Sequence, residues 1–434
     1  MQNTAFMTQL SRQFAKLEPY LPCSNELNLR HLRHEAMLAL NNIGLPHKKQ
    51  DTWKYTSLAP LAEIPFKVYT HPSSALSLSL LKPFIINDDK DNVLVFLNGY
   101  HLPALSHTND ACHGLTLTHF KHVAKMQPEL LHELIAKGHT SKQFFQQMNS
   151  AFTTDGALVI IAENKTIKHP IHLYHFLVNP SQHPTMASTQ THIFVEKNAH
   201  ATLIEHFITL SDQAVCLNTQ TFIHGYKEAA LTYTKNAHHD KNAYSVNLLQ
   251  ANLYAASLTL FDIGVGGKYQ RQENQIYFHE KDSKLKVSGM MVPFSHEHID
   301  WVYHVHHQIP LCESIINLKS LVGEKGHSSF LGKISVAQNA QKTITNIQNK
   351  NMLIGKVGIA DSLPQFEILA DDVQCVHGSS VSQLDENQLY YLQSRGLDEI
   401  QAKELMIKAF VEDVFHHLEH NIKEQVMAYI QRQI

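Results

Sequence analysis

Cys375 and His377 are the residues of this chain whose types and spacing best suit a soft metal. The run from Phe366 to His377 alternates as an extended strand would, so both side chains project to one face. Cysteine thiolate and histidine hold iron-sulfur clusters, and a complete site needs about four such ligands. One chain therefore offers half a site, and a partner would complete it at a subunit interface. The other interpretation is structural, since free cysteine is among the most buried residue types.

Two more interpretations concern the same run. Asp371 and Asp372 could give entering Fe(II) hard oxygen ligands. Asp372 faces away from His377 on the predicted strand, however, and both residues are more often found in turns or at the surface. A Cys-His nucleophilic hydrolase is excluded by geometry, because residues two apart on a strand lie about 7 Å apart, too far for the thiol to hydrogen-bond its base.

The remaining cysteines and histidines give weaker signals. The odd number of cysteines and their wide spacing favour reduced thiols in a cytosol over a disulfide framework. We expect packing roles for most of them and leave Cys312 between packing and function. The cysteines are Cys23, Cys112, Cys216, Cys312 and Cys375. The 32 histidines include several clusters, none with the spacing of a zinc protease. His304 and His306 share one face of a predicted strand. This face could be a weak metal site or a solvated surface without a ligand.

Length and charge narrow the class of protein. The chain has 434 residues, enough for a large core or two to three domains. Its formal net charge of -3, with no basic patch, argues against a nucleic-acid partner. Residues 1–30 contain no continuous apolar signal region, and no run approaches the ~18 apolar residues of a membrane span. We therefore expect a cytoplasmic protein.

Three regions follow from the hydrophobic patterns. Residues 1–148 are predicted to form a mostly helical domain, with helices at Asn25 to Asn42 and at Glu129 to Met148, and a strand at Val93 to Leu97. Gly138 interrupts the second helix. Residues 149–380 change to short β-rich runs at roughly 8 to 12 residue spacing, typical of a sandwich, a barrel or a β-helix. The clearest of these runs are 157–161, 192–196, 230–234, 257–261 and 284–288.

Residues 381–434 are predicted to be helical. Asp385 with Gln388, and Asp398 with Gln401, are capping pairs on either side of Gly396, so two tandem helices are indicated. Apolar residues then recur every fourth position from Ala402 to Ile434. Because that spacing drifts by about 40° per step around a helix of 3.6 residues per turn, we predict a break or bend near Asn421.

Blocks of sequence between about residues 40 and 415 resemble the SufB/SufD family, scaffold subunits that work with the ATPase SufC in iron-sulfur cluster assembly. The blocks are, in order, Gly44 to Leu58 with Trp53-Lys54-Tyr55-Thr56 inside it, Leu97 to Gly99 with Leu105-Ser106, Asn149 to Phe152 with Asp155-Gly156, His307 to Ser314 with Lys319, Phe330 to Ile334, Ala340 to Thr343, Asn349 to Leu353, and Pro364 to Gly396. Gly378, where SufB is expected to carry Glu, favours the SufD branch, as do the chain length and the Trp53 block.

The resemblance implies a fold and a mechanism. The fold is a mainly β, right-handed parallel β-helix core flanked by N-terminal and C-terminal helical regions. The function is that of a non-catalytic scaffold whose β-helix edge meets SufB, with His377 as iron ligand or delivery group and Cys375 as second ligand or packing thiol. The cargo would be iron or a transient iron-sulfur cluster shared with SufB, and a homodimer of the isolated chain stays open.

The resemblance also implies that residues 381–434 dock SufC, through Tyr390, Leu392, Arg395, Gly396 and Phe410. SufC would supply ATP hydrolysis, since no phosphate-binding loop occurs here. The nearest run, Gly264 to Lys268, lacks both the spacing and the following hydroxyl, so this chain is expected to bind no nucleotide. The alternative from another class is a β-helical carbohydrate-active enzyme, disfavoured by the absence of a secretion signal and of a paired set of carboxylates in the middle region.

Overall fold

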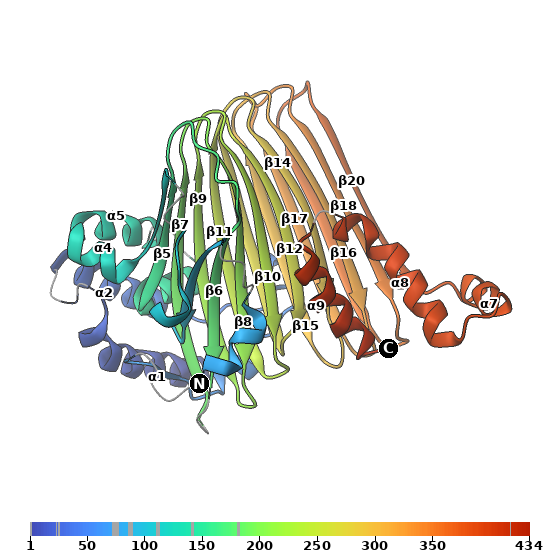
Figure 1. The fold of residues 1–434 in the computed structure, drawn as a ribbon, viewed down its shortest axis with the longest axis horizontal. Helices are drawn as coiled ribbons and strands as arrows, with labels where there is room; N and C mark the ends of the chain where they lie inside the picture. Colours follow the sequence, from blue (N-terminus) through green and yellow to red (C-terminus); the bar gives the residue numbers. More distant parts are fainter. Residues whose placement is uncertain are drawn as a thin grey trace.

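The computed structural model is mainly β and winds into a parallel β-solenoid of about eight turns (Figure 1). It describes residues 2–22, 24, 27–71, 78–85, 90–109, 113–139, 143–179, 183–416 and 418–434. Each turn adds one strand to each of two ten-stranded sheets, called sheet A and sheet B. Helices lie at both ends of the chain. The expected parallel β-helix with flanking helical regions is therefore confirmed.

The two sheets run side by side along the solenoid axis, and within the described residues only the pairs β2–β3 and β4–β5 are antiparallel. Sheet A contains β4 (Leu115–His119), β5 (Asp155–Ile161), β7 (Thr185–Val195), β9 (Val215–Gly225), β11 (Ala243–Tyr254), β13 (Tyr269–Glu280), β15 (His298–His307), β17 (His327–Val336) and β19 (Ile359–Ile368), with β1 (Lys67–Val68) beside β7. Sheet B contains β2 (Asn92–Leu97), β3 (Tyr100–His101), β6 (Ile171–Val178), β8 (His200–Leu210), β10 (Ala230–His239), β12 (Ser257–Gly266), β14 (Lys284–Val292), β16 (Glu313–Val322), β18 (Ile344–Leu353) and β20 (Gln374–Gln383).

The core follows from the register of these strands. Parallel in-register pairing places equivalent positions of successive turns in one column, and alternate residues point inward. One inward column of sheet B is completely buried over five turns, and its members are Tyr233, Leu260, Val287, Ile316 and Ile347. All five predicted β-rich runs fall largely within strands, which are longer than expected because each strand spans a whole face of the solenoid.

The interior of the first turns also holds a carboxylate, Glu205 of β8. Its oxygens accept hydrogen bonds from Tyr233, Thr191 at 2.5 Å and Thr221 at 2.8 Å, and lie 2.8 Å from His175 Nε2. Burial alone would raise the pKa of Glu205, but these partners lower it below the ordinary value. Because its oxygens are satisfied, this buried charge is explained structurally.

The N-terminal region packs its helices against sheet A. These helices are α1 (Gln2–Leu17), α2 (Leu27–Ile43), α3 (Ala59–Ala62), α4 (Phe120–Met126), α5 (Pro128–His139) and α6 (Phe144–Phe152). The predicted helix at Asn25 to Asn42 corresponds to α2, with Asn25 outside the described residues. The helix predicted at Glu129 to Met148 with an interruption at Gly138 corresponds to two helices, since α5 ends at His139 and α6 begins at Phe144. The predicted strand is β2, which joins sheet B by pairing with β6.

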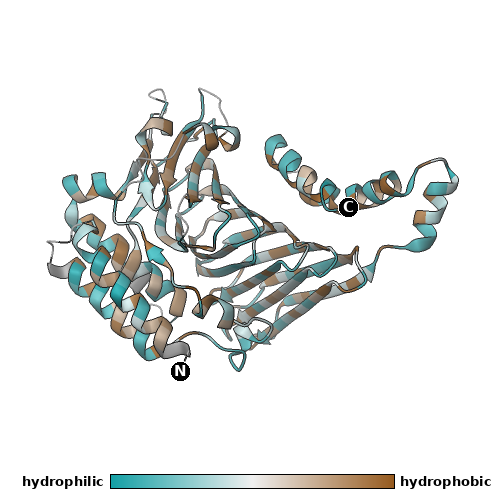
Figure 2. Ribbon diagram, turned by 90° about the horizontal axis from the view of Figure 1, so that it is seen from below, coloured by the Kyte–Doolittle hydropathy of each residue, from teal (hydrophilic) through white to brown (hydrophobic). Residues whose placement is uncertain are grey.

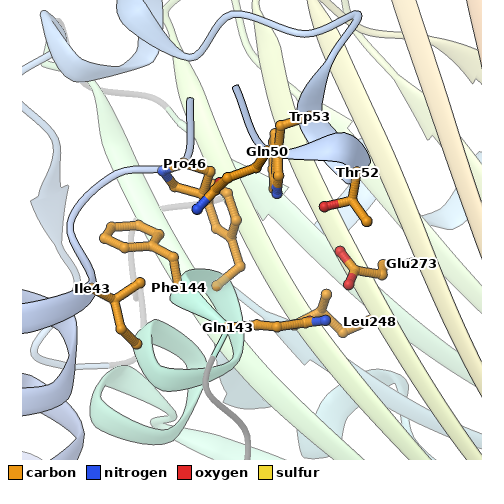
Figure 3. Close-up of a pocket in the computed structure, with 10 residues that line it drawn as sticks. Ile43, Pro46, Gln50, Thr52, Trp53, Gln143, Phe144, Leu248 and Glu273 are labelled. Carbon is orange, nitrogen blue, oxygen red and sulfur yellow. The ribbon is translucent and has the colours of Figure 1, made fainter. Parts of the chain in front are cut away.

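A polar cluster fastens this region to the solenoid. Arg271 of β13 lies 3.7 Å from the centre of the Trp53 ring and donates to the carbonyl oxygen of Thr52. The same guanidinium is 2.5 Å from Asp300 and 3.1 Å from Glu273, and it is completely buried. Thr56, Tyr269 and Ser329 donate to Asp300 as well. We call Trp53, Thr56, Arg271, Glu273 and Asp300 the N-terminal latch. Figure 3 shows Trp53 and Glu273 around an adjoining cavity of about 120 Å³.

The C-terminal helices are α7 (Glu386–Ser394), α8 (Glu399–Phe415) and α9 (His420–Gln431). The predicted caps are present: Asp385 accepts from backbone amides of α7, Asp398 forms a capping box with Gln401, and Gly396 adopts a positive φ of 99°. The predicted break near Asn421 is confirmed a few residues earlier, between Phe415 and His420. The helices α8 and α9 lie over sheet B (Figure 1). Their apolar side chains pack against outward residues of that sheet, such as Phe261 and Met290.

Tyr429 adds a polar anchor for α9, because its hydroxyl donates to the carboxylate of Glu297 at 2.6 Å. Burial raises the pKa of Glu297 to about 7.

Among the described helices, none combines the length and apolar content that a bilayer crossing requires.

The latch predicts a large effect of Asp300→Ala on stability. Removing one partner leaves the buried Arg271 only partly neutralised, at a cost of about 3 kcal/mol in the free energy of unfolding, measured by urea denaturation. Burial would raise the pKa of Asp300, but Arg271 outweighs it and the pKa lies below the ordinary value. The stabilisation is therefore present above the pKa of an unfolded aspartate, about 4, and is lost as pH falls through the lower folded value.

The matched control is Lys197→Ala. It removes an exposed ion pair in which Lys197 Nζ lies 3.8 Å from Glu163 Oε1. Its expected change is below about 1 kcal/mol. Equal effects of the two substitutions would show that the latch contributes no more than a surface ion pair.

Candidate functional site

The run from Phe366 to His377 is not one strand, and that expectation was wrong. β19 ends at Ile368 and β20 begins at Gln374, with a corner between them. The corner stacks on that of the preceding turn, since Leu369 N–H donates to Val336 and Lys342 N–H donates to Asp372. The alternating sequence pattern continues through the corner, so the pattern gave no sign that the chain passes from sheet A to sheet B. Leu369 and Val373 belong to this corner and not to the strand that carries Cys375 and His377.

Cys375 and His377 nevertheless lie two residues apart on β20, as expected. They pair in register with Thr345 and Ile347 of β18, which are 1% and 0% exposed inside the solenoid. Phe366 of β19 packs edge-on against the ring of His377, with centroids 4.8 Å apart. Both candidate ligands therefore occupy inward columns at the mouth of the last turn, where no further turn covers them.

The lack of a covering turn sets the accessibility and ionisation of the pair. His377 is exposed and Cys375 is half-buried, although the equivalent positions one turn earlier are buried. Burial raises the pKa of Cys375, so its thiol is protonated at neutral pH. A metal would therefore displace a proton as it bound the thiolate.

This chain supplies too few ligands for a complete site. Within the described residues, no group of three or more His, Cys, Asp and Glu side chains gathers in a way that would hold a metal ion. Asp371 and Asp372 lie exposed in the corner and do not join Cys375 and His377. The half-site expected from the sequence therefore stays a prediction, with two candidate ligands at the open end.

Apolar side chains surround the open end. The exposed set, which we call the last-turn face, comprises Ile359, Ile368, Leu369, Val376 and Val381. Leu369 is 63% exposed and Val376 is 56% exposed. Neither β19 nor β20 has a strand on its outer side among the described residues. An uncovered strand edge with exposed apolar side chains is typical of an interaction surface.

Comparison with known proteins accounts for both the core and the N-terminal region. The family model "SUF system FeS cluster assembly, SufBD core domain" matches residues 176–410, and "SufBD protein N-terminal region" matches residues 5–173. The chain belongs to the SufBD family. The resemblance identified from the sequence blocks is thus confirmed.

Relatives of this SufBD chain carry names from the same system. The iron-sulfur cluster assembly protein SufD of Escherichia coli is 29% identical over 89% of this chain and 89% of its own length. An iron-sulfur cluster assembly SufBD family protein of Synechocystis is 28% identical over 89% of this chain and 86% of its own length. SufD of Plasmodium falciparum is 25% identical over 57% of this chain and 17% of its own length.

The residues expected to dock an ATPase lie in two different environments. Tyr390, Arg395 and Gly396 are exposed on or just after α7, and Leu392 is half-buried there. The Arg395 guanidinium lies over the ring of Tyr391, 5.2 Å from the ring centre. Phe410 instead lies half-buried on α8, with Lys319 Nζ of sheet B 4.8 Å from its ring centre. The first four residues thus group together, and Phe410 contacts the solenoid.

Two further cysteines and the pair His304 and His306 lie in packed surroundings. Cys216 and Cys312 are buried, and the Cys312 thiol donates to the carbonyl of Glu280. Cys23 and Cys112 lie outside the described residues. His304 and His306 are half-buried, with ring centres 3.7 Å apart, and burial lowers their pKa values to about 3 and 4.

Sequence reasoning missed the N-terminal latch. Its one visible signal was the Trp53 block, whereas Arg271 and Asp300 are more than two hundred positions away. Arg271 also binds both Glu273 and Asp300, two carboxylates that therefore have a cationic partner. A carbohydrate-active enzyme would need such a pair free to act as acid and base.

Exposure at the open end predicts the order of thiol alkylation. With iodoacetamide at pH 8, Cys375 should be modified at least tenfold faster than Cys216, whose pKa burial raises to about 12. Peptide mass spectrometry of the native chain measures both rates, and alkylation in urea gives the unhindered reference. Equal native rates would contradict the placement of Cys375 at the mouth.

Proposed function

We propose that this chain is a non-catalytic scaffold subunit of the SUF system, which pairs with SufB and is coupled to the ATPase SufC. The observation that carries the proposal is the open last turn, where Cys375 and His377 stand at the mouth of the solenoid. The ligand pair and the interaction surface coincide there. A subunit that docks on this end would complete the metal site and cover the strands at once.

The physical need for a cap supports pairing at this end. A solenoid repeat contacts only its neighbours, so a terminal repeat leaves half of its contacts unmade. The last-turn face exposes five large apolar side chains, and β20 leaves its outer backbone groups unpaired within the described chain. The helices α8 and α9 lie on the outer face of sheet B. A second solenoid end would supply both the apolar contacts and the remaining ligands.

The cargo in this proposal is iron or a nascent iron-sulfur cluster. Thiolate and imidazole suit both species. Because each subunit would hold only part of the ligand set, separating the two subunits would release the cargo without breaking a complete protein cage. The chemistry of this chain is limited to binding, proton loss from Cys375 and orientation of His377 by the Phe366 ring.

The helix α7 and the start of α8 support a docking role. No residue of α7 is buried, and Tyr390 is 73% exposed. In Figure 2 this arm extends away from the solenoid, which leaves its apolar side chains free for a partner. Further exposed apolar residues on the arm are Tyr391, Ile400 and Leu405. In the proposal SufC binds this arm, and ATP hydrolysis belongs to SufC.

The iron-binding part is tested with His377→Ala in the complex co-purified anaerobically with SufB and SufC. Loss of a direct ligand should weaken metal binding at least about tenfold, because even changes outside the ligand shell cost 10–100-fold. Iron and sulfide per complex are the measured quantities. The complex itself should still form, since the last-turn face is unchanged.

His200→Ala is the matched control, since His200 is an exposed strand histidine far from the mouth. It should leave iron and sulfide unchanged. Retention of metal by His377→Ala would make His377 structural. Failure of the unmodified chain to recruit either subunit would overturn the scaffold assignment itself.

The docking arm is tested by comparing Tyr390→Ala with Phe410→Ala. Tyr390→Ala should weaken SufC binding by about 2 kcal/mol and leave the thermal midpoint unchanged, because the side chain is exposed in the free chain. Phe410→Ala should lower stability by about 1–3 kcal/mol, since it removes packing and the Lys319 contact. Calorimetric titration and thermal denaturation separate the two effects. Unchanged SufC affinity in Tyr390→Ala would contradict docking at the arm.

A further inference from the structure

Three lysines surround a pocket on the outer face of sheet B, away from the mouth of the solenoid. Lys286, Lys319 and Lys350 come from the successive strands β14, β16 and β18. Asn317, Gln348 and Asp413 of α8 complete the polar lining. The volume of this lysine pocket is about 200 Å³. The sequence blocks contain Lys319 and Lys350, but neither has a part in the scaffold function proposed above.

The charges in the lysine pocket are not balanced by the chain. Lys319 and Lys350 are paired in register, so two like charges stand directly opposite on neighbouring strands, an arrangement that is destabilising by itself. Lys319 Nζ donates to Asp413 and to the carbonyl of Phe410, each at 2.5 Å. Lys286 and Lys350 form no ion pair within the described part of the chain. Three cations therefore face one carboxylate, in a chain whose net charge is -3.

Uncharged polar groups extend the same surface. Asn317 and Gln348 are register neighbours, and Gly378 follows them in the same outward column. Because Gly378 has no side chain, no side chain of β20 stands beside Gln348 in this column. A Cβ at Gly378 would lie 2.6 Å from Oε1 of Gln348, which is the movable end of a flexible side chain. Ammonium groups and side-chain amides together donate to oxyanions.

We propose that the lysine pocket binds a phosphoryl-class oxyanion. Lysine is an established phosphate binder that acts as a point charge, and two of the three ammonium groups have all their donors available to a ligand. Pockets for drug-sized molecules are about 300–1,000 Å³, so 200 Å³ suits a phosphate or pyrophosphate group and not a whole nucleotide. The ligand would replace the missing counter-charge between Lys319 and Lys350.

The test is a titration of the full chain with inorganic phosphate, pyrophosphate and ATP, in which ³¹P NMR measures binding. Chloride keeps the ionic strength constant. Phosphate and pyrophosphate should bind saturably. Lys350→Gln should weaken binding about tenfold, the effect of losing one charge-assisted hydrogen bond. Gly378→Glu should weaken it similarly, because it sets a carboxylate at the open side of the pocket. Lys281→Gln, which removes an exposed lysine in the turn before β14, is the matched control and should change binding less than twofold.

Each outcome decides the proposal. Loss of binding in Lys350→Gln and Gly378→Glu with retention in Lys281→Gln supports the site, and ATP affinity equal to that of pyrophosphate identifies the phosphoryl group as the recognised unit. Much tighter ATP binding, lost in the same two variants, supports the site with a nucleotide as the source of the phosphate. Absence of saturable binding, or equal weakening by all three substitutions, overturns it.

Discussion

Every strand from β7 to β20 pairs with the strand two positions earlier in the chain, in parallel and mostly without a slip in register. That repeated backbone ladder decides which side chains meet. A residue faces inward or outward with its whole column, so one shift by a single position would expose the buried column from Tyr233 to Ile347. The apolar interior, the outward lysines and the placement of Cys375 and His377 all follow from the same register.

The elements outside the solenoid depend on its two faces. The N-terminal region is held on sheet A by the buried Arg271, which contacts Trp53 and Asp300 together. The C-terminal helices are held on sheet B by apolar packing and by Tyr429 on Glu297. Both attachments bury apolar side chains, and the N-terminal one adds the buried ion pairs of Arg271, so acid is expected to weaken it through Asp300.

The candidate metal site arises where the ladder stops. In earlier turns the columns of Cys375 and His377 are filled by residues such as Thr345 and Ile347, which the next turn covers. At β20 no next turn follows, so the same geometry that builds a core leaves a thiol and an imidazole accessible among exposed apolar residues. The accessibility of Cys375 and His377 therefore requires no local distortion of the fold. It follows from the end of the solenoid at β20.

Local features were readable from the sequence because they rest on neighbouring residues. The caps at Asp385 and Asp398, the helix break before His420 and the shared face of Cys375 and His377 depend on spacings of two to four positions. Gly138 likewise indicated the end of α5 one residue before it occurs. The corner before Gln374 was missed, because hydrophobic alternation continued across it.

The sequence by itself determined the types of residue, their alternation and, through its motif blocks, the family. Only the tertiary structure decided that Trp53 meets Arg271, that Lys319 stacks on Lys350 and that Cys375 lies at an open end. The physical reason is that periodicity records which face a residue occupies within its own strand. It does not record which residue of another strand lies alongside. In a solenoid, the number of residues in each intervening turn decides which residues become neighbours.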